Sequence, residues 1–276
     1  MPTLVGALAR STHPGPTVAV TTIAVLLGVG VGVEPPRLLL LGLAVLANQV
    51  SVGLSNDWID ADRDRAVGRA DKPIARGWVS VRTVRTAAWV SAATSLVLTV
   101  PLGVGAWCAQ FVFIASAWAY NAGLKATAFS VVPYIVSFGL LPVLVTQSLT
   151  EPAGAAWWAV AVGALLGIAA HFANVLPDLD DDKRTGIRGL PHRLGRVAAG
   201  ITTYVVLAAA SVVVVSSSGI PVLAGGIGLA LNLAIAAVGI TLVITRPPSR
   251  LLFQLIMAAA LLNVALLVLA GDHVAV

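Results

Sequence analysis

Four oxygen-bearing side chains stand at the point where the second long apolar stretch of the sequence gives way to an acidic cluster. Asn56, Asp60 and Asp64 recur every four residues, and Asp57 follows Asn56 directly. On a continuing helix this spacing places the three on one face, with about 40° of drift per step. Carboxylates this close repel one another, so they are typical of a site where a hard divalent cation, usually Mg²⁺ with a phosphate beside it, neutralises them.

The same pattern returns in the second half of the chain, after another long apolar stretch. Asn174, Asp178 and Asp182 repeat the spacing of the first row. Further identities at the same offset, such as Gly186 with Gly68, indicate an internal repeat. Two acidic rows that face each other predict a metal site between them, with Asn56, Asp60, Asp64, Asp178 and Asp182 as its ligands.

Basic side chains follow both acidic rows, and a further polar stretch lies between them. Arginine pairs with phosphate oxygens through two parallel hydrogen bonds, and lysine supplies a point charge. We therefore expect a diphosphate clamp. Its substrate-binding residues are expected to be Asn56, Arg63, Lys72, Tyr120, Lys125, Asn174, Lys183 and Arg188. A clamp at the water end of apolar helices suits a lipid diphosphate, and Asn48 and His171, deeper in their helices, are candidates for the acceptor end of the cavity.

The rest of the chain is strongly apolar. Of its 276 residues 58% are hydrophobic and 11% charged, and the mean hydropathy is +0.94, which excludes an ordinary soluble domain. At 1.5 Å per residue, most of the apolar stretches can cross about 30 Å of hydrocarbon. We expect an all-α, multi-pass membrane protein with one domain, 1–276, and nine transmembrane helices in a bundle, at 17–33, 38–58, 84–103, 105–122, 131–149, 154–176, 197–217, 219–245 and 251–270.

The distribution of charge predicts the orientation of these spans. With loops taken alternately, every Lys and Arg except Arg37 falls on one side. This asymmetry places the N-terminus and both motif loops, 59–83 and 177–196, in the cytoplasm and the C-terminus outside. It also explains the net charge of +5 without a nucleic-acid partner. The excess of Ala, Val, Gly and Arg suggests a bacterial source, hence a bacterial inner membrane.

These motifs resemble those of a known family. Asn56-Asp57-x-x-Asp60-x-x-x-Asp64 resembles the first aspartate-rich signature of the UbiA family of intramembrane prenyltransferases, and Asp178-x-x-x-Asp182 resembles the second. The resemblance implies Mg²⁺-dependent transfer of a prenyl group from an allylic isoprenyl diphosphate to a hydrophobic acceptor in the membrane. It further implies that Lys72 and Lys125 are basic contacts and that the catalytic residues are Asp57, Asp60, Asp64, Asp178 and Asp182. One departure is Lys72-Pro73, where many members have Arg-Pro.

The residues suit this chemistry. Metal ions and basic groups draw charge onto the departing diphosphate, so that the C–O bond ionises to an allylic cation, and the bundle excludes water. Ring faces stabilise such a cation. The aromatic candidates are Trp58, Phe111, Trp118, Tyr134, Phe138 and Phe172.

Two other functions remain open from the sequence. A terpene cyclase on the same scaffold would use an unchanged clamp and capture the cation with a double bond of its own substrate. A carrier of polyprenyl phosphates would bind the lipid without releasing diphosphate, and it would not require so dense an acidic cluster. The sequence identifies neither the acceptor nor the length of the prenyl chain.

Overall fold

The computed structural model describes residues 2–179, 186–246 and 249–276. In these ranges the chain is helical, apart from turns, loops and one isolated bridge between Ala155 and Ala275. The longer helices are α2 (Pro14–Val31), α3 (Pro35–Ile59), α5 (Val81–Thr99), α6 (Val104–Asn121), α7 (Val132–Thr146), α8 (Trp157–Val175), α11 (Arg196–Ser217), α12 (Val222–Thr245) and α13 (Arg250–Leu269). The shorter ones are α1 (Leu4–Ser11), α4 (Ala61–Ala66), α10 (Leu190–Leu194), η1 (Val100–Leu102), η2 (Leu124–Ala126), η3 (Leu176–Asp178) and η4 (Gly271–His273).

Seven of the described helices are long and apolar enough to cross a membrane, which makes the chain a multi-pass membrane protein. Each of the expected spans falls on one of the longer helices. Two of these, α6 and α7, are outside the seven, and α7 has only 15 residues.

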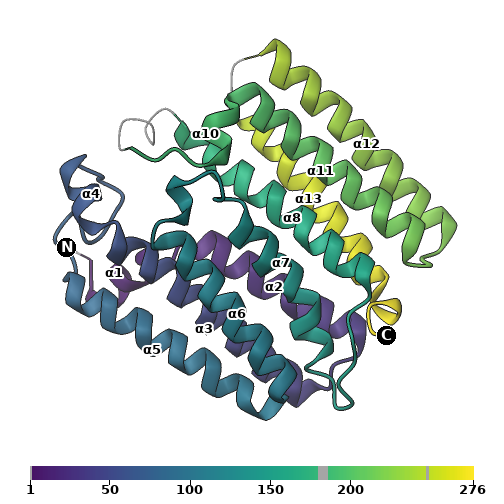
Figure 1. Cartoon of the computed structure of the whole chain (residues 1–276), viewed down its shortest axis with the longest axis horizontal. Coiled ribbons are helices and arrows are strands. Elements are labelled where there is room, and N and C mark those ends of the chain that lie inside the picture. Colours follow the sequence, from purple (N-terminus) through teal and green to yellow (C-terminus); the bar gives the residue numbers. More distant parts are fainter. Residues whose placement is uncertain (1, 180–185, 247–248) are drawn as a thin grey trace.

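The long helices form one bundle whose first and last members meet. Along the chain, α3 packs on α5, α6 on α7, α7 on α8, α8 on α11 and α11 on α12. The contacts of α2 with α3, α7 and α13 bring the N-terminal and C-terminal long helices side by side (Figure 1). The crossing of α7 and α8 is close, because a Cβ on Gly163 or Gly167 would lie 2.4 Å from a backbone oxygen of α7. This close contact holds α7, which carries Tyr134 and Ser137, in position against α8.

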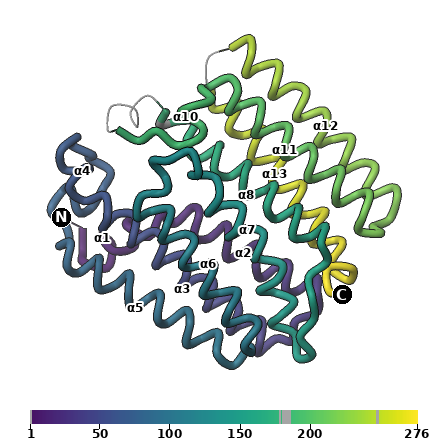
Figure 2. The backbone as a smooth tube through the Cα atoms, viewed as in Figure 1, coloured from purple at the N-terminus to yellow at the C-terminus, as the bar shows by residue number. Residues whose placement is uncertain are grey.

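The loops that follow the two acidic rows lie at the same end of the bundle, as the positions of α4 and α10 show (Figure 2). The two termini of the chain lie at opposite ends (Figure 1). At the loop end, α8 stops at Val175 and a turn of 3₁₀ helix containing Pro177 follows. Proline has no N–H and clashes with the preceding turn, which explains why the α-helix ends here.

Candidate active site

The first acidic row keeps its helical register through a break. The α-helix α3 ends at Ile59, and Asp60 separates it from α4. Backbone bonds nevertheless continue, from Asp60 N to Asn56 O at 3.0 Å and from Asp64 N to Asp60 O at 2.8 Å. The three side chains therefore share one face, as predicted from their spacing, and all three line one cavity.

Asp60 is paired with two cations. Lys125 Nζ lies 2.6 Å from its Oδ1 and 2.5 Å from its Oδ2, and Arg63 Nη2 lies 2.9 Å from Oδ2. Burial lowers the pKa of Lys125, and the neighbouring Asp60 carboxylate opposes that shift. Asn56 completes the group, since its Nδ2 donates to Asp60 Oδ2 and to Asn121 Oδ1, each at 3.3 Å. Its own Oδ1 stays available as a ligand.

Asp64 is the least compensated carboxylate of the row. Its side chain is 4% exposed, and its ion pair with Arg63 is long, with Nη2 3.8 Å from Oδ1. Burial raises the pKa of Asp64, Lys72 lowers it, and the nearby Asp60 charge raises it further. A bound divalent cation would supply the missing positive charge.

Asp57 points into a different environment. Its Oδ1 accepts hydrogen bonds from Lys72 Nζ at 2.6 Å and from His13 Nε2 at 3.0 Å, and those two nitrogens lie 3.1 Å apart. Asp57 is 2% exposed. It lines neither the cavity that the acidic row faces nor the second, apolar cavity described below. Lys72 and His13 do line the cavity of the acidic row. Asp57 thus holds two basic side chains at that cavity's wall.

His13 reaches this position through an unusual backbone conformation. It precedes α2 with φ of 54°, the one positive φ at a non-glycine position in the described chain. The turn before it lies directly on α3, because a Cβ on Gly53 would be 2.3 Å from the carbonyl oxygen of Thr12. The absence of a side chain at Gly53 therefore permits the contact between His13 and Asp57.

The acidic row opens into a cavity of about 380 Å³, here called the polar cavity. Most of the predicted clamp lines it. Its charged and polar lining comprises Arg10, His13, Asn56, Asp60, Arg63, Asp64, Arg69, Asp71, Lys72, Tyr120, Lys125, His171, Asn174 and His192. Arg188 is exposed and lies outside this lining.

The second acidic row is described only in part. The backbone of Asp178 lies in η3, directly after α8, whereas Asp182 and Lys183 lie outside the described residues. The loop beyond them returns to the polar cavity. Leu190 N donates to Ser130 Oγ at 2.8 Å, and the same hydroxyl lies 3.0 Å from His171 Nε2. This end of the second loop is therefore tied to the turn before α7 and, through His171, to α8 at the cavity wall.

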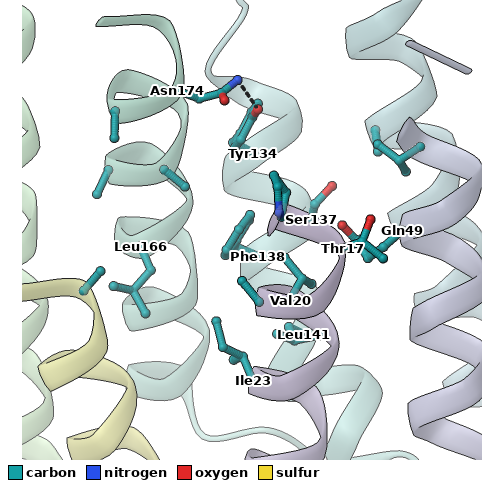
Figure 3. Close-up of a pocket in the computed structure, with 18 of the residues that line it drawn as sticks. Thr17, Val20, Ile23, Gln49, Tyr134, Ser137, Phe138, Leu141, Leu166 and Asn174 are labelled. Carbon is teal, nitrogen blue, oxygen red and sulfur yellow. Dashed lines mark hydrogen bonds between the residues drawn. The ribbon is translucent and has the colours of Figure 1, made fainter. Parts of the chain in front are cut away.

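A second cavity, of about 570 Å³, continues into the bundle and is here called the apolar cavity. Four residues line both cavities and are named the collar: His13, Asn56, Tyr120 and Asn174. Asn174 Nδ2 donates to Tyr134 Oη at 3.5 Å at the top of the apolar cavity (Figure 3). Below them the lining is largely aliphatic, with Val20, Ile23, Leu141 and Leu166 among its members. A charged chamber thus leads directly into a hydrocarbon one.

The structure sorts the aromatic candidates for cation stabilisation. Tyr134 and Phe138 line the apolar cavity and stack on each other with ring centroids 6.2 Å apart. The other four are outside its lining. Trp58 packs edge-on to Trp118, Phe111 is half exposed, and Phe172 is buried against His171.

The ligand set suits Mg²⁺ as far as it is described. Asn56, Asp60 and Asp64 present hard oxygen donors to one cavity, which is the donor type that Mg²⁺ prefers. Within the described ranges there is no group of three or more His, Cys, Asp or Glu residues that could by itself hold a metal ion. Within the described ranges, the first row alone is therefore an incomplete ligand set for a metal ion.

Two features of the site were not predicted from the sequence. His13 belongs to the site only because the α1–α2 turn packs on α3, 44 residues away from Asp57 in the sequence. Gln49 lines the apolar cavity, whereas Asn48, the predicted lining residue, is completely buried outside it. The difference comes from the helical rotation. Gln49, seven residues before Asn56, points within about 20° of the same direction, whereas Asn48, eight residues before it, points about 80° away.

Comparisons with known proteins agree with this architecture. The chain resembles a UbiA homologue from Archaeoglobus fulgidus bound to DMAPP and Mg²⁺, with a TM-score of 0.75, 16% identity and coverage of 96% of this chain and 99% of the other. It also resembles the structure of a digeranylgeranylglyceryl phosphate synthase, with a TM-score of 0.69, 12% identity and coverage of 97% and 98%. At these identities the likeness shows the fold alone.

A curated relative and a protein family match the sequence itself. The relative is the bacteriochlorophyll synthase 33 kDa chain of Cereibacter sphaeroides, which is 29% identical over 211 residues, or 68% of this chain. The match spans 66% of that relative's length. The family described as the UbiA prenyltransferase family matches residues 16–256, which include the first acidic row and three of the four collar residues, Asn56, Tyr120 and Asn174. The chain therefore belongs to the UbiA prenyltransferase family.

Proposed function

We propose that this protein transfers a prenyl group from an allylic isoprenyl diphosphate to a hydrophobic acceptor within the membrane. One observation carries the proposal: the polar cavity, lined by carboxylates and cations, opens through the collar into the apolar cavity. A prenyl diphosphate has the same two parts in the same order. The UbiA homologue from Archaeoglobus fulgidus, bound to DMAPP and Mg²⁺, supports this substrate class.

The ionisable residues receive the following roles. Asn56, Asp60 and Asp64 would hold Mg²⁺ together with Asp178 and Asp182 of the second motif. When bound, the metal draws negative charge onto the departing diphosphate. Lys125 and Arg63, which pair with Asp60, are placed to bind diphosphate oxygens, as is Lys72. Lys183 and Arg188 are proposed as further contacts. Asp57 acts through Lys72, whose ammonium it holds at the wall.

The reaction then takes place at the collar. The bond between C1 of the prenyl chain and the diphosphate oxygen breaks, and its electron pair leaves with the diphosphate. Tyr120 and Asn174 face the reacting carbon in this proposal, with the ring of Tyr134 one layer deeper. The aliphatic lining below excludes water from the allylic cation. The acceptor forms the new bond to C1 and loses a proton.

The proposal extends to the membrane. We place all nine longer helices across the bilayer, α6 and α7 included, since each coincides with an apolar span of the sequence. The opposite locations of the termini agree with an odd number of crossings (Figure 1). The basic loops place the N-terminus and both motif loops in the cytoplasm of a bacterial cell, with the C-terminus outside the inner membrane. Residues 1–276 form one catalytic domain.

Diphosphate release tests this function. Purified protein in nanodiscs would receive Mg²⁺ and C5 to C20 allylic diphosphates, first without acceptor and then with membrane extract. A transferase releases diphosphate when the extract is added and forms a prenylated product. Release without extract, with a hydrocarbon product, would identify a cyclase instead. Binding without release under either condition would identify a carrier.

Matched variants assign that release to the site. Asp60→Asn removes a charge from the acidic row, whereas Asp62→Asn removes one two residues away, where Asp62 is fully exposed and pairs with Arg65. We expect loss of release in the first variant and wild-type release in the second. Equal activity of Asp60→Asn and the wild type would contradict the proposed site.

A further inference from the structure

Three hydrogen-bonding side chains lie in the wall of the apolar cavity below the Tyr134–Asn174 pair. They are Thr17 of α2, Gln49 of α3 and Ser137 of α7, and they are here called the polar belt. Each is more than nine-tenths buried, with exposed fractions of 5%, 8% and 5%. Figure 3 shows them below the Tyr134–Asn174 pair and above Ile23.

The belt has unused hydrogen-bonding capacity. Ser137 Oγ is buried without a partner, and the amide of Gln49 forms no hydrogen bond with any described residue. Thr17 Oγ1 donates to Thr12 O at 2.8 Å and retains its acceptor capacity. Buried polar groups are normally paired, and leaving one unpaired is costly. These groups therefore indicate a ligand with a polar atom at this depth.

The prenyl chain is not that ligand. An isoprenoid is a hydrocarbon, so it offers the amide of Gln49 neither a donor nor an acceptor. The diphosphate does not reach the belt either, because its cations and carboxylates line the polar cavity. By helical rise, Gln49 lies about 10 Å below Asn56, and Thr17 about 6 Å below His13. A second molecule must supply the polar atom.

The lack of charged side chains in the described lining of the apolar cavity restricts the charge that this second molecule can carry. The apolar cavity has no Lys, Arg, Asp or Glu in its described lining, and its one ionisable histidine, His13, is already bonded to Asp57 at the collar. A carboxylate or phosphate at the belt would be desolvated without a counter-ion, which is strongly unfavourable. A neutral hydroxyl or carbonyl needs only the hydrogen bonds that the belt offers.

We propose that Gln49 and Ser137, with Thr17, form the subsite that binds the acceptor of the prenyl group, and that this acceptor carries an uncharged hydroxyl or carbonyl, as a phenol or quinol does. This inference rests on the proposed function and specifies its second substrate. The location suits the chemistry, since an acceptor held below the collar approaches C1 from the side opposite the diphosphate. The belt then acts as an anchor for the far side of the acceptor ring.

A matched pair of probes tests the subsite without turnover. Binding of 2-naphthol, which is neutral at pH 7, and of 2-naphthoate, which is anionic, would be measured by equilibrium dialysis against the protein in nanodiscs, with empty nanodiscs subtracted. We expect saturable binding of 2-naphthol and none of 2-naphthoate. Gln49→Leu should weaken 2-naphthol about tenfold and Ser137→Ala about threefold to tenfold, as expected for lost neutral hydrogen bonds.

Controls separate this test from folding and from the proposed function. Gln147→Leu makes the same chemical change outside both cavities, at a side chain that donates to Ala153 O, and should bind 2-naphthol as the wild type does. Geranyl diphosphate with Mg²⁺ should bind unchanged to Gln49→Leu and Ser137→Ala, which verifies their fold. Failure of the wild type to bind it would defeat the proposed function, whereas saturable binding of 2-naphthol would still show a site for neutral ligands at the belt. The subsite would be overturned if the wild type showed no saturable binding of 2-naphthol, or if it bound 2-naphthoate equally well. It would also be overturned if both belt variants bound 2-naphthol as tightly as the wild type does.

Discussion

The ammonium of Lys125 contacts both carboxylate oxygens of Asp60, at 2.6 and 2.5 Å. The two residues come from different loops, 65 positions apart in the sequence, and both side chains are nearly buried. Asp60 is also a proposed metal ligand, so under the proposed function Lys125 and Mg²⁺ would compete for the same oxygens. When a diphosphate bound with its metal, Lys125 would gain a new anionic partner in place of Asp60.

This competition predicts opposite effects of one substitution on two ligands. Lys125→Met keeps most of the apolar stem and removes the charge. Without substrate, we expect it to bind Mg²⁺ more tightly than the wild type, because Asp60 keeps only Arg63 as a cationic partner. Its affinity for geranyl diphosphate should fall at least tenfold, since a charge-assisted hydrogen bond contributes about 1.5–3 kcal/mol. Calorimetric titration of both ligands measures this, and weaker Mg²⁺ binding with unchanged diphosphate binding would refute it.

The acidic row predicts a metal-dependent change in stability. Asp64 is buried with little compensation, so a divalent cation should stabilise the folded protein by binding it. We expect millimolar Mg²⁺ to raise the melting temperature of the wild type and EDTA to reverse the rise. Asp64→Asn should lose this response, and its melting temperature without metal should not fall, because the substitution removes a buried charge. Asp62→Asn, exposed on the same helix, should respond like the wild type.

Local periodicity was sufficient to predict that the first acidic row shares one face. A four-residue repeat places Asn56, Asp60 and Asp64 on one face of any helix, and the register survives the break at Asp60 because the backbone bonds continue across it. The apolar spans are also predicted from local sequence, since a run of about 20 apolar residues indicates a membrane-spanning helix. From the sequence, Lys125 was expected to be a basic contact of the diphosphate, whereas its pairing with Asp60 was not predicted.

Contacts that depend on packing were beyond the sequence. Nothing in the residues around His13 indicates that it meets Asp57, because the meeting requires the α1–α2 turn to lie on Gly53. The direction of Asp57 likewise depends on Lys72 folding back from the motif loop. Gln49 was missed in favour of Asn48 because residue type was considered without the helical angle from Asn56, which favours Gln49.

The Asp57–Lys72 pair predicts non-additive effects. If Asp57 acts by positioning the Lys72 ammonium, Asp57→Asn and Lys72→Met should each raise the KM for the prenyl diphosphate, and the double variant should be no worse than Lys72→Met alone. Asp57→Glu should recover part of the loss, because it keeps the charge. Steady-state kinetics over a range of diphosphate concentrations at saturating Mg²⁺ would measure these effects. Additive losses would show that Asp57 has a role independent of Lys72.

The close contact at Gly53 predicts a loss of both stability and substrate binding from a single methyl group. Gly53→Ala places a Cβ against the backbone oxygen of Thr12, which cannot rotate away as a side chain can, so the α1–α2 turn must shift and take His13 from Asp57. We expect a destabilisation of about 1–3 kcal/mol, the usual cost of overpacking, and a higher KM for the prenyl diphosphate. Gly226→Ala is the matched control, since it is also helical but has no heavy atom within 4 Å of its new Cβ. Its melting temperature should equal or exceed that of the wild type, because alanine is the better helix former. If both variants melt and bind alike, the turn accommodates the methyl group and His13 is not held by this contact.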